Sequence, residues 1–117
     1  MALFALVFVS LAVAGPRKRR VTVTFNYDFN LNHACSMTLT KNCIKQFNVY
    51  DATDKEQVKL FSIPVPAEAT GLVKGITGTS PLISLRAGEH SLVVTAQEAD
   101  GTESDFGAGT IRIHIKP

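Results

Sequence analysis

The chain has 117 residues, 12 of them basic and 10 acidic, with a formal net charge of +2. This is the length of one domain. Four of the basic residues form the run RKRR at 17–20, which leaves the rest of the chain slightly acidic, with 8 basic residues against 10 acidic ones. Because a protein that binds nucleic acid shows a basic face, we expect no nucleic-acid partner.

The first fourteen residues, MALFALVFVSLAVA, are apolar except for Ser10 and carry no charge. A bilayer span needs about 20 apolar residues, so we expect no stable membrane span. The length of this run, with small residues at Ala12 and Ala14, is typical of a secretory signal peptide that is cleaved after Ala14. The sequence therefore predicts a secreted or cell-envelope protein.

The charges around this apolar run leave an alternative open. No Lys or Arg precedes the run, although a signal peptide normally starts with basic residues, and RKRR follows it instead. A reversed anchor that keeps the domain inside would suit this charge order, but the short length disfavours it. RKRR itself could be a processing site or an anionic-surface tether. We interpret it as a solvated linker, which divides the chain into a signal peptide (1–14), a basic linker (15–20) and one domain (21–117).

Two cysteines, Cys35 and Cys43, lie eight positions apart. Together with the nearby His33 they do not supply the four ligands of a structural zinc site. In an exported chain we expect one disulfide that closes a small loop. In a reducing cytoplasm the same residues would be two free thiols.

The run VTVTFNYDFN (21–30) alternates between apolar and polar residues without a fault. This period of two, with β-branched and aromatic residues, predicts a half-buried strand. Its expected inner face consists of Val21, Val23, Phe25, Tyr27 and Phe29. Further strands are predicted at 43–51, 58–66, 90–98 and 110–117, with a short one in PLISLRAG.

The segment AEATGLVKGITGTSP is expected to be irregular, with one short strand near Gly75–Thr77. We find no convincing helix, and parallel β/α folds need helices between their strands. Six or seven short strands in about 100 residues predict an all-β antiparallel sandwich.

Three stretches resemble the fibronectin type III-like domains, which belong to the immunoglobulin-like β-sandwiches. VTVTF is similar to their second strand, with Phe25 at an aromatic core position. IKQFNVYD is similar to their third strand, with Phe47 and Val49 in the core. HSLVVTAQEADGTES is similar to their sixth strand and the turn after it; its matching residues are Leu92, Val94, Ala96, Gly101 and Ser104.

The resemblance covers roughly residues 20–117 and departs from the family at two points. The core Trp is absent. His90 stands where the family usually has a Tyr that pins a corner of the fold, so we expect His90 to be hydrogen bonded in that corner. The cysteine loop would join the second and third strands at one end of the sandwich.

No catalytic motif is present: the sequence has no Gly-x-Ser-x-Gly, His-Glu-x-x-His or phosphate-loop pattern. We therefore expect a non-enzyme with no catalytic residue and no cofactor. Two acidic groups could offer oxygen ligands to Ca²⁺, but Asx and Gly residues also build turns, and we expect turns and no metal. These groups are Asp51, Asp54 and Glu56, and Asp100, Glu103 and Asp105.

Our leading hypothesis is an exported β-sandwich module for protein binding, adhesion or cell-envelope structure, with an unknown protein or glycan partner. The alternative is a carbohydrate- or calcium-binding accessory domain. The loops most suited to binding are 30–42 and 99–105, which the resemblance places at the same end of the sandwich. The candidate binding residues are His33, Tyr50, Asp100, Glu103 and Asp105.

Overall fold

The computed structural model describes residues 3–13, 18–53, 57–66, 68–86, 88–104 and 111–115, with backbone alone for the first and last of these ranges. Its strands are β1 (Leu3–Val13), β2 (Lys18–Asp28), β3 (Ile44–Asp51), β4 (Val58–Pro64), β5 (Leu72–Thr79), β6 (Ile83–Ser84), β7 (Gly88–Glu98) and β8 (Ile111–Ile115). The all-β prediction is confirmed. Within these ranges, no helix has the length and apolar character to cross a membrane.

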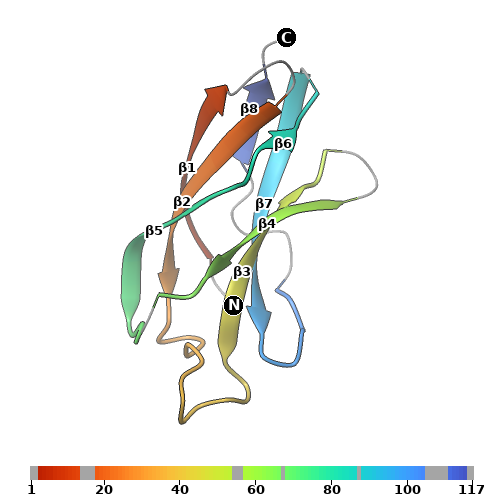
Figure 1. Ribbon diagram of the computed structural model, residues 1–117. Helices are drawn as coiled ribbons and strands as arrows, with labels where there is room; N and C mark the ends of the chain where they lie inside the picture. The colour runs from red at the N-terminus through yellow and green to blue at the C-terminus, as the bar shows by residue number, and fades with distance from the viewer. Residues whose placement is uncertain are drawn as a thin grey trace.

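The strands form two antiparallel sheets (Figure 1). One sheet has the order β1-β2-β5, with the short β6 also paired to β2. The other has the order β4-β3-β7-β8. Side chains from both sheets meet in one core, so the architecture is β-sandwich-like, as predicted.

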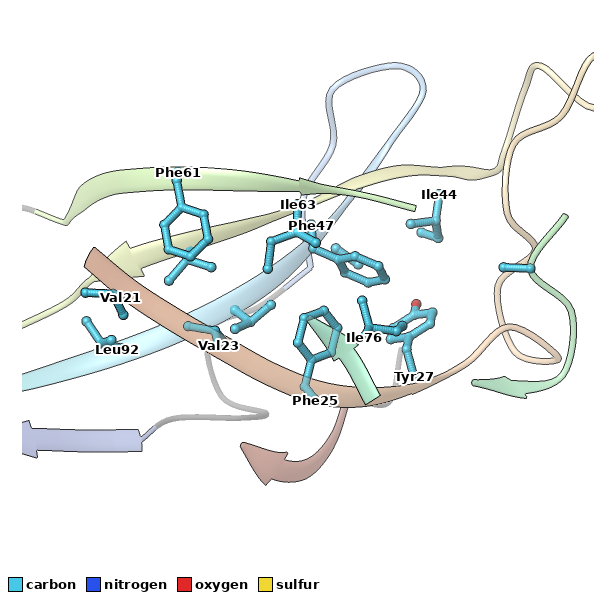
Figure 2. Close-up of a cluster of buried hydrophobic side chains, with 14 of the residues drawn as sticks. Val21, Val23, Phe25, Tyr27, Ile44, Phe47, Phe61, Ile63, Ile76 and Leu92 are labelled. Atoms are coloured by element: carbon cyan, nitrogen blue, oxygen red, sulfur yellow. The ribbon is translucent and has the colours of Figure 1, made fainter. Parts of the chain in front are cut away.

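The alternating face of β2 builds one side of this core. The residues at odd positions from Val21 to Phe29 are all at most 1% exposed, as their period predicts. Phe47 on β3 meets them from the other sheet (Figure 2). Its ring centroid lies 4.8 Å from that of Phe25 and 5.1 Å from that of Tyr27, both edge to face. Such pairs stabilise the fold by about 0.5–1.5 kcal/mol each beyond the area they bury.

The predicted core positions of the second sheet are also confirmed. The residues that the resemblance selected are buried against the same cluster: Phe47, Val49, Leu92, Val94 and Ala96. Pro64 ends β4 at the edge of its sheet, where a residue without an N–H group costs no ladder hydrogen bond.

Gly78 on β5 lets the two sheets approach closely at one edge. A Cβ atom added there would lie 2.3 Å from Cγ1 of Ile63, a core residue on β4. No real contact is that short, so any larger residue would push β4 away from β5. The glycine is therefore a packing requirement and not a turn signal.

The extent of β5 differs from the prediction, which gave this segment one short strand. It is an eight-residue strand, Leu72–Thr79, paired with β2. Only Ile76 on β5 is buried, so the strand carries almost no hydrophobic period. Pairing with β2 defines it instead, with hydroxyl contacts of 3.0 Å between Thr22 and Thr79 and between Thr24 and Thr77 on the outer face.

The N-terminal segment also differs from expectation. The structure pairs β1 with β2 from Leu3 opposite Tyr27 to Val13 opposite Arg19. β1 thus supplies the first strand of the sheet from within the predicted signal peptide, whose cleavage stays a prediction. β2 begins at Lys18, so three residues of the expected basic linker belong to a strand.

Candidate functional site

The loop between β2 and β3 is closed by a disulfide between Cys35 and Cys43, as predicted. The two Cα atoms are 4.8 Å apart, and Cys43 is fully buried. Closing a loop of about nine residues stabilises the fold by roughly 2.5 kcal/mol in the chain-entropy model. We call residues 30–42 the stapled loop.

Backbone hydrogen bonds fix the stapled loop further. Ile44 donates its N–H to the carbonyl of His33 (2.8 Å), and Cys35 donates to the carbonyl of Ile44 (2.9 Å). A turn follows, in which the N–H of Ser36 donates to the carbonyl of Leu39 (2.8 Å) and the N–H of Leu39 donates to Oγ of Ser36 (3.0 Å). The loop is therefore held in one shape by its own chain and by β3.

This fixed loop exposes apolar side chains. Met37 is 99% exposed, Leu31 57% and Leu39 37%. Single exposed apolar residues are common on protein surfaces, whereas a group of them marks an interaction site. Met37 and Leu39 lie inside the ring that the disulfide closes, and Leu31 precedes it in the same loop, so this loop is the first component of the candidate site.

The second component is the turn after β7. Asp100 accepts a hydrogen bond from the N–H of Thr102 on Oδ1 (2.9 Å), and this contact lowers the pKa of its exposed carboxyl. Gly101 has a φ of +95°, a backbone conformation that L side chains rarely adopt. Asp100 therefore acts in turn formation, the role we expected for this acidic group.

The two loops lie side by side at one end of the sandwich. Ala99 donates its N–H to the carbonyl of Cys43 (3.0 Å). Between the loops is an open cleft of about 340 Å³, lined by Thr40, Lys41, Asn42, Ala99 and Asp100. Its lining brings an ammonium and a carboxylate next to the apolar loop, so one end of the domain offers both apolar and charged contacts.

Glu103 and Tyr50 form a separate cluster, away from the cleft. The Tyr50 hydroxyl lies 2.7 and 2.8 Å from the two carboxylate oxygens of Glu103, which also accept from Asn48 (2.8 Å) and Thr95 (2.6 Å). Burial and the bond to Glu103 raise the pKa of Tyr50 to about 12. Burial raises the pKa of Glu103, but the three hydrogen bonds outweigh it and the net shift is downward. The carboxylate therefore clamps the turn onto β3 and β7.

Amide side chains continue this polar cluster across the outer face of the sheet. Asn48 is fully buried and donates from Nδ2 to Gln97 (2.8 Å), and its Oδ1 accepts from Gln46 (2.8 Å) and Ser62 (2.8 Å). Because these groups satisfy one another, the cluster contributes to stability and leaves few polar atoms for a ligand.

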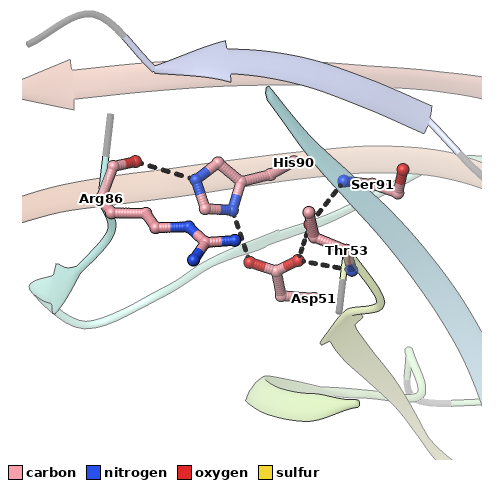
Figure 3. A network of polar contacts seen from close by, with 5 residues as sticks. All are labelled: Asp51, Thr53, Arg86, His90 and Ser91. Atoms are coloured by element: carbon pink, nitrogen blue, oxygen red, sulfur yellow. Dashed lines mark hydrogen bonds and ion pairs between the residues drawn. The ribbon is translucent and has the colours of Figure 1, made fainter. Parts of the chain in front are cut away.

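The opposite end of the sandwich contains His90, which is 4% exposed (Figure 3). Its Nδ1 lies 2.6 Å from Oδ2 of Asp51, and its Nε2 lies 2.8 Å from the carbonyl oxygen of Arg86, four residues upstream. Both partners are oxygen atoms that accept hydrogen bonds, so the ring is held from both of its nitrogens. This is the hydrogen-bonded corner expected for His90, with an additional carboxylate partner.

Asp51 is held from a second direction. Thr53 donates to Oδ1 of Asp51 from its N–H (3.1 Å) and also from its hydroxyl, which in turn accepts from the N–H of Ser91 (3.0 Å). Burial raises the pKa of Asp51, but the hydrogen bonds from Thr53 and His90 outweigh it, and the pKa is lowered. An open pocket of about 310 Å³ adjoins this corner. Both ring nitrogens of His90 are engaged, which fits a structural role.

The structure separates the predicted binding residues. His33 is exposed in the stapled loop and Asp100 lines the cleft, whereas Tyr50 and Glu103 bind each other on the outer face of the sheet. Asp105 lies outside the described residues. Among the described residues, no group of three His, Cys, Asp or Glu side chains is arranged to hold a metal ion.

Sequence reasoning missed the exposed Leu31, Met37 and Leu39, because it selected only the polar His33 as a candidate within the loop 30–42. The sequence did contain a usable signal: apolar residues lie within and beside the disulfide loop. Side chains on so short a closed loop seldom reach the core, so they are expected to be exposed. Comparison with family models, curated proteins and solved structures finds no match to this chain.

Proposed function

We propose that this chain is an exported, non-enzymatic interaction module of the fibronectin type III-like class, which binds a protein through the stapled loop and the cleft beside it. The strand orders β1-β2-β5 and β4-β3-β7-β8 support this class. With β1 counted and β6 taken as a short addition, these orders resemble those of a seven-stranded immunoglobulin-like sandwich. The histidine corner at the start of β7 also supports it, since it occupies the position of the family's tyrosine corner.

The observation that carries the proposal is the exposure of Leu31, Met37 and Leu39 on a loop that is already ordered. Exposing apolar side chains gives no benefit to folding, and a disulfide lowers the conformational entropy that the loop would lose on binding. Apolar anchors surrounded by polar groups are typical of the centre and rim of a protein–protein interface. The nearby Lys41 and Asp100 would belong to that rim.

Export is supported by two independent features. Residues 1–14 have the apolar run and the small residues that are typical of a signal peptide, and Cys35 and Cys43 form a disulfide. Disulfides persist in oxidising compartments such as the periplasm and the extracellular space. An extracellular or cell-envelope location follows as part of the proposal.

The test is a retention assay with the exported protein as bait against extracellular and envelope fractions of the organism that encodes it. Met37→Asp should abolish retention of the specific partner, because a charge would be buried in the apolar contact. Leu82→Asp is the matched control, since Leu82 is 40% exposed and lies just before β6, which pairs with the start of β2 at the other end of the sandwich. Equal retention by the wild type and Met37→Asp, or an equal loss in both variants, would contradict the proposed site.

A further inference from the structure

β2 is paired along both of its edges, and one of these edges is covered by β1 alone. Along one edge of β2, β5 pairs with residues Thr22 to Asp28 and β6 pairs with Lys18 and Arg19. On the other side, β1 runs antiparallel to almost the whole strand. The residues that cover this second edge are the same ones that the sequence predicts to be a removable signal peptide.

The backbone of β2 shows which groups face β1. Val21 accepts from the N–H of Ser80 on its carbonyl (2.9 Å) and donates its own N–H to Oγ of Ser80 (2.9 Å), so its polar groups point toward the β5 side. Backbone groups alternate in direction along a strand. Those of Thr22 and Thr24 therefore point toward β1, and they lose their partners when β1 is removed. An open edge of this kind is a template for another strand.

Our inference rests on the export and cleavage in the proposed function. A signal peptidase hydrolyses the bond between Ala14 and Gly15, consuming one water and leaving a carboxylate on Ala14 and an amine on Gly15. We propose that the processed chain then pairs with a second copy of itself, β2 against β2, through the edge that β1 had covered. In the unprocessed chain β1 occupies this edge of β2, so β2 cannot pair there with a second copy.

Charge complementarity along β2 favours a second copy as the occupant. An antiparallel pair related by two-fold symmetry and centred on Val23 keeps the buried and outer faces of both strands aligned. It places Lys18 opposite Asp28 of the second copy, and Thr22 opposite Thr24. Lys18 is exposed and Asp28 is half-buried on the outer face. Opposite charges directly across a pair of strands stabilise the pairing, and the two-fold axis generates each contact twice.

The outer face also continues through such a dimer. Thr22 and Thr24 already form a ladder with Thr79 and Thr77 on β5, at hydroxyl distances of 3.0 Å. A second β2 would extend this ladder of small polar side chains, because Thr22 would face Thr24 of the second copy. The dimer therefore gains main-chain hydrogen bonds between two β2 strands whose outward side chains are compatible with those of the second copy.

The first experiment compares oligomeric states. The full chain, produced without export, and the exported chain are each identified by intact mass and then analysed by sedimentation velocity over a dilution series. We expect the full chain to be a monomer and the processed chain to be a dimer that dissociates on dilution. The inference is overturned by a processed chain that stays monomeric at every concentration, by a full chain that dimerises equally, or by an exported chain that retains residues 1–14.

The second experiment tests the register with a charge swap in the processed chain. Lys18→Asp places like charges opposite each other twice and should weaken dimerisation about tenfold. The double variant Lys18→Asp with Asp28→Lys restores opposite charges and should recover most of the affinity. A double variant that dimerises no better than Lys18→Asp would overturn the register. Because Asp28 also accepts from the N–H of Asn30 (2.9 Å), thermal unfolding of each variant serves as the check on folding.

The two proposals fail separately. A processed monomer that still retains a partner through Met37 overturns the dimer and leaves the loop function intact. A processed dimer that retains no partner, or one that is insensitive to Met37→Asp, overturns the loop function and leaves the dimer intact.

Discussion

The two ends of the sandwich are built by opposite means. At the end that contains Asp51 and His90, the His90 side chain is buried and both of its ring nitrogens are hydrogen bonded. At the end that contains the stapled loop, covalent and backbone bonds hold the chain, and apolar side chains such as Met37 point outward. One end is therefore stabilised by hydrogen bonds between side chains, and the other by a disulfide and backbone hydrogen bonds that hold a loop with exposed apolar side chains.

The largest expected effect is at the histidine corner. Asp51→Ala removes the acceptor of His90 and of Thr53 together, leaving a buried imidazole without its carboxylate. We expect a loss of about 3 kcal/mol in the free energy of unfolding, measured by urea denaturation. Glu89→Ala, at the exposed neighbour of His90, is the control and should stay within about 0.5 kcal/mol of the wild type. A corner variant as stable as this control would remove the distinction between the two ends.

The disulfide should have the second-largest effect. Replacing both Cys35 and Cys43 by Ala should lower stability by about 2.5 kcal/mol, since the unfolded chain gains the entropy of an open loop. The same variant should weaken partner retention, because the loop must then be ordered on binding. Chemical denaturation and the retention assay measure the two effects. A variant that loses stability but keeps full retention would show that the staple serves the fold alone.

Glu103 and Asp100, the two acidic residues of the turn after β7, should differ in how much they contribute to stability. Glu103→Ala removes the acceptor of Asn48, Tyr50 and Thr95, and we expect a loss of about 1 kcal/mol, because the carboxylate is partly screened by solvent. Asp100→Ala should leave the unfolding midpoint close to that of the wild type, since Asp100 is fully exposed. Thermal unfolding of both variants tests whether Glu103→Ala is the more destabilising of the two. Equal midpoints would show that Glu103 does not clamp the turn.

The smallest expected effect is on pH dependence. The pKa of Asp51 is lower in the folded chain than its ordinary value of 3.8, so its ionised form stabilises the fold above that value. This contribution is lost as the pH falls through the folded pKa. The stability difference between the wild type and Asp51→Asn should therefore shrink below about pH 4. A stability difference that stays constant from neutral pH to below about pH 4 would contradict a stabilising role for the ionised Asp51 carboxylate.

The sequence was informative where one strand carries its own pattern. The odd positions of 21–29 and the core residues Phe47 and Leu92 follow from alternation and from family resemblance, and the disulfide follows from two cysteines. β5 was underestimated because only one of its side chains is buried, so its strand character comes from pairing with β2.

Contacts between distant parts of the chain could not be predicted. His90 was expected to be hydrogen bonded, but its partner Asp51 is 39 positions away. Tyr50 and Glu103 were both candidate binding residues, yet they are 53 positions apart and bind each other. No local pattern records such a pairing, because it depends on which strands become neighbours in the sheet.

The most direct test of the central claim is site-specific photocrosslinking in the native environment. A photoreactive residue replaces Met37 in one variant and Val58 in a second, and crosslinked products are identified by mass. We predict a discrete protein adduct from position 37 and none of comparable yield from position 58. Adducts of equal yield from both positions, or an adduct from position 58 alone, would contradict the assignment of binding to the stapled loop.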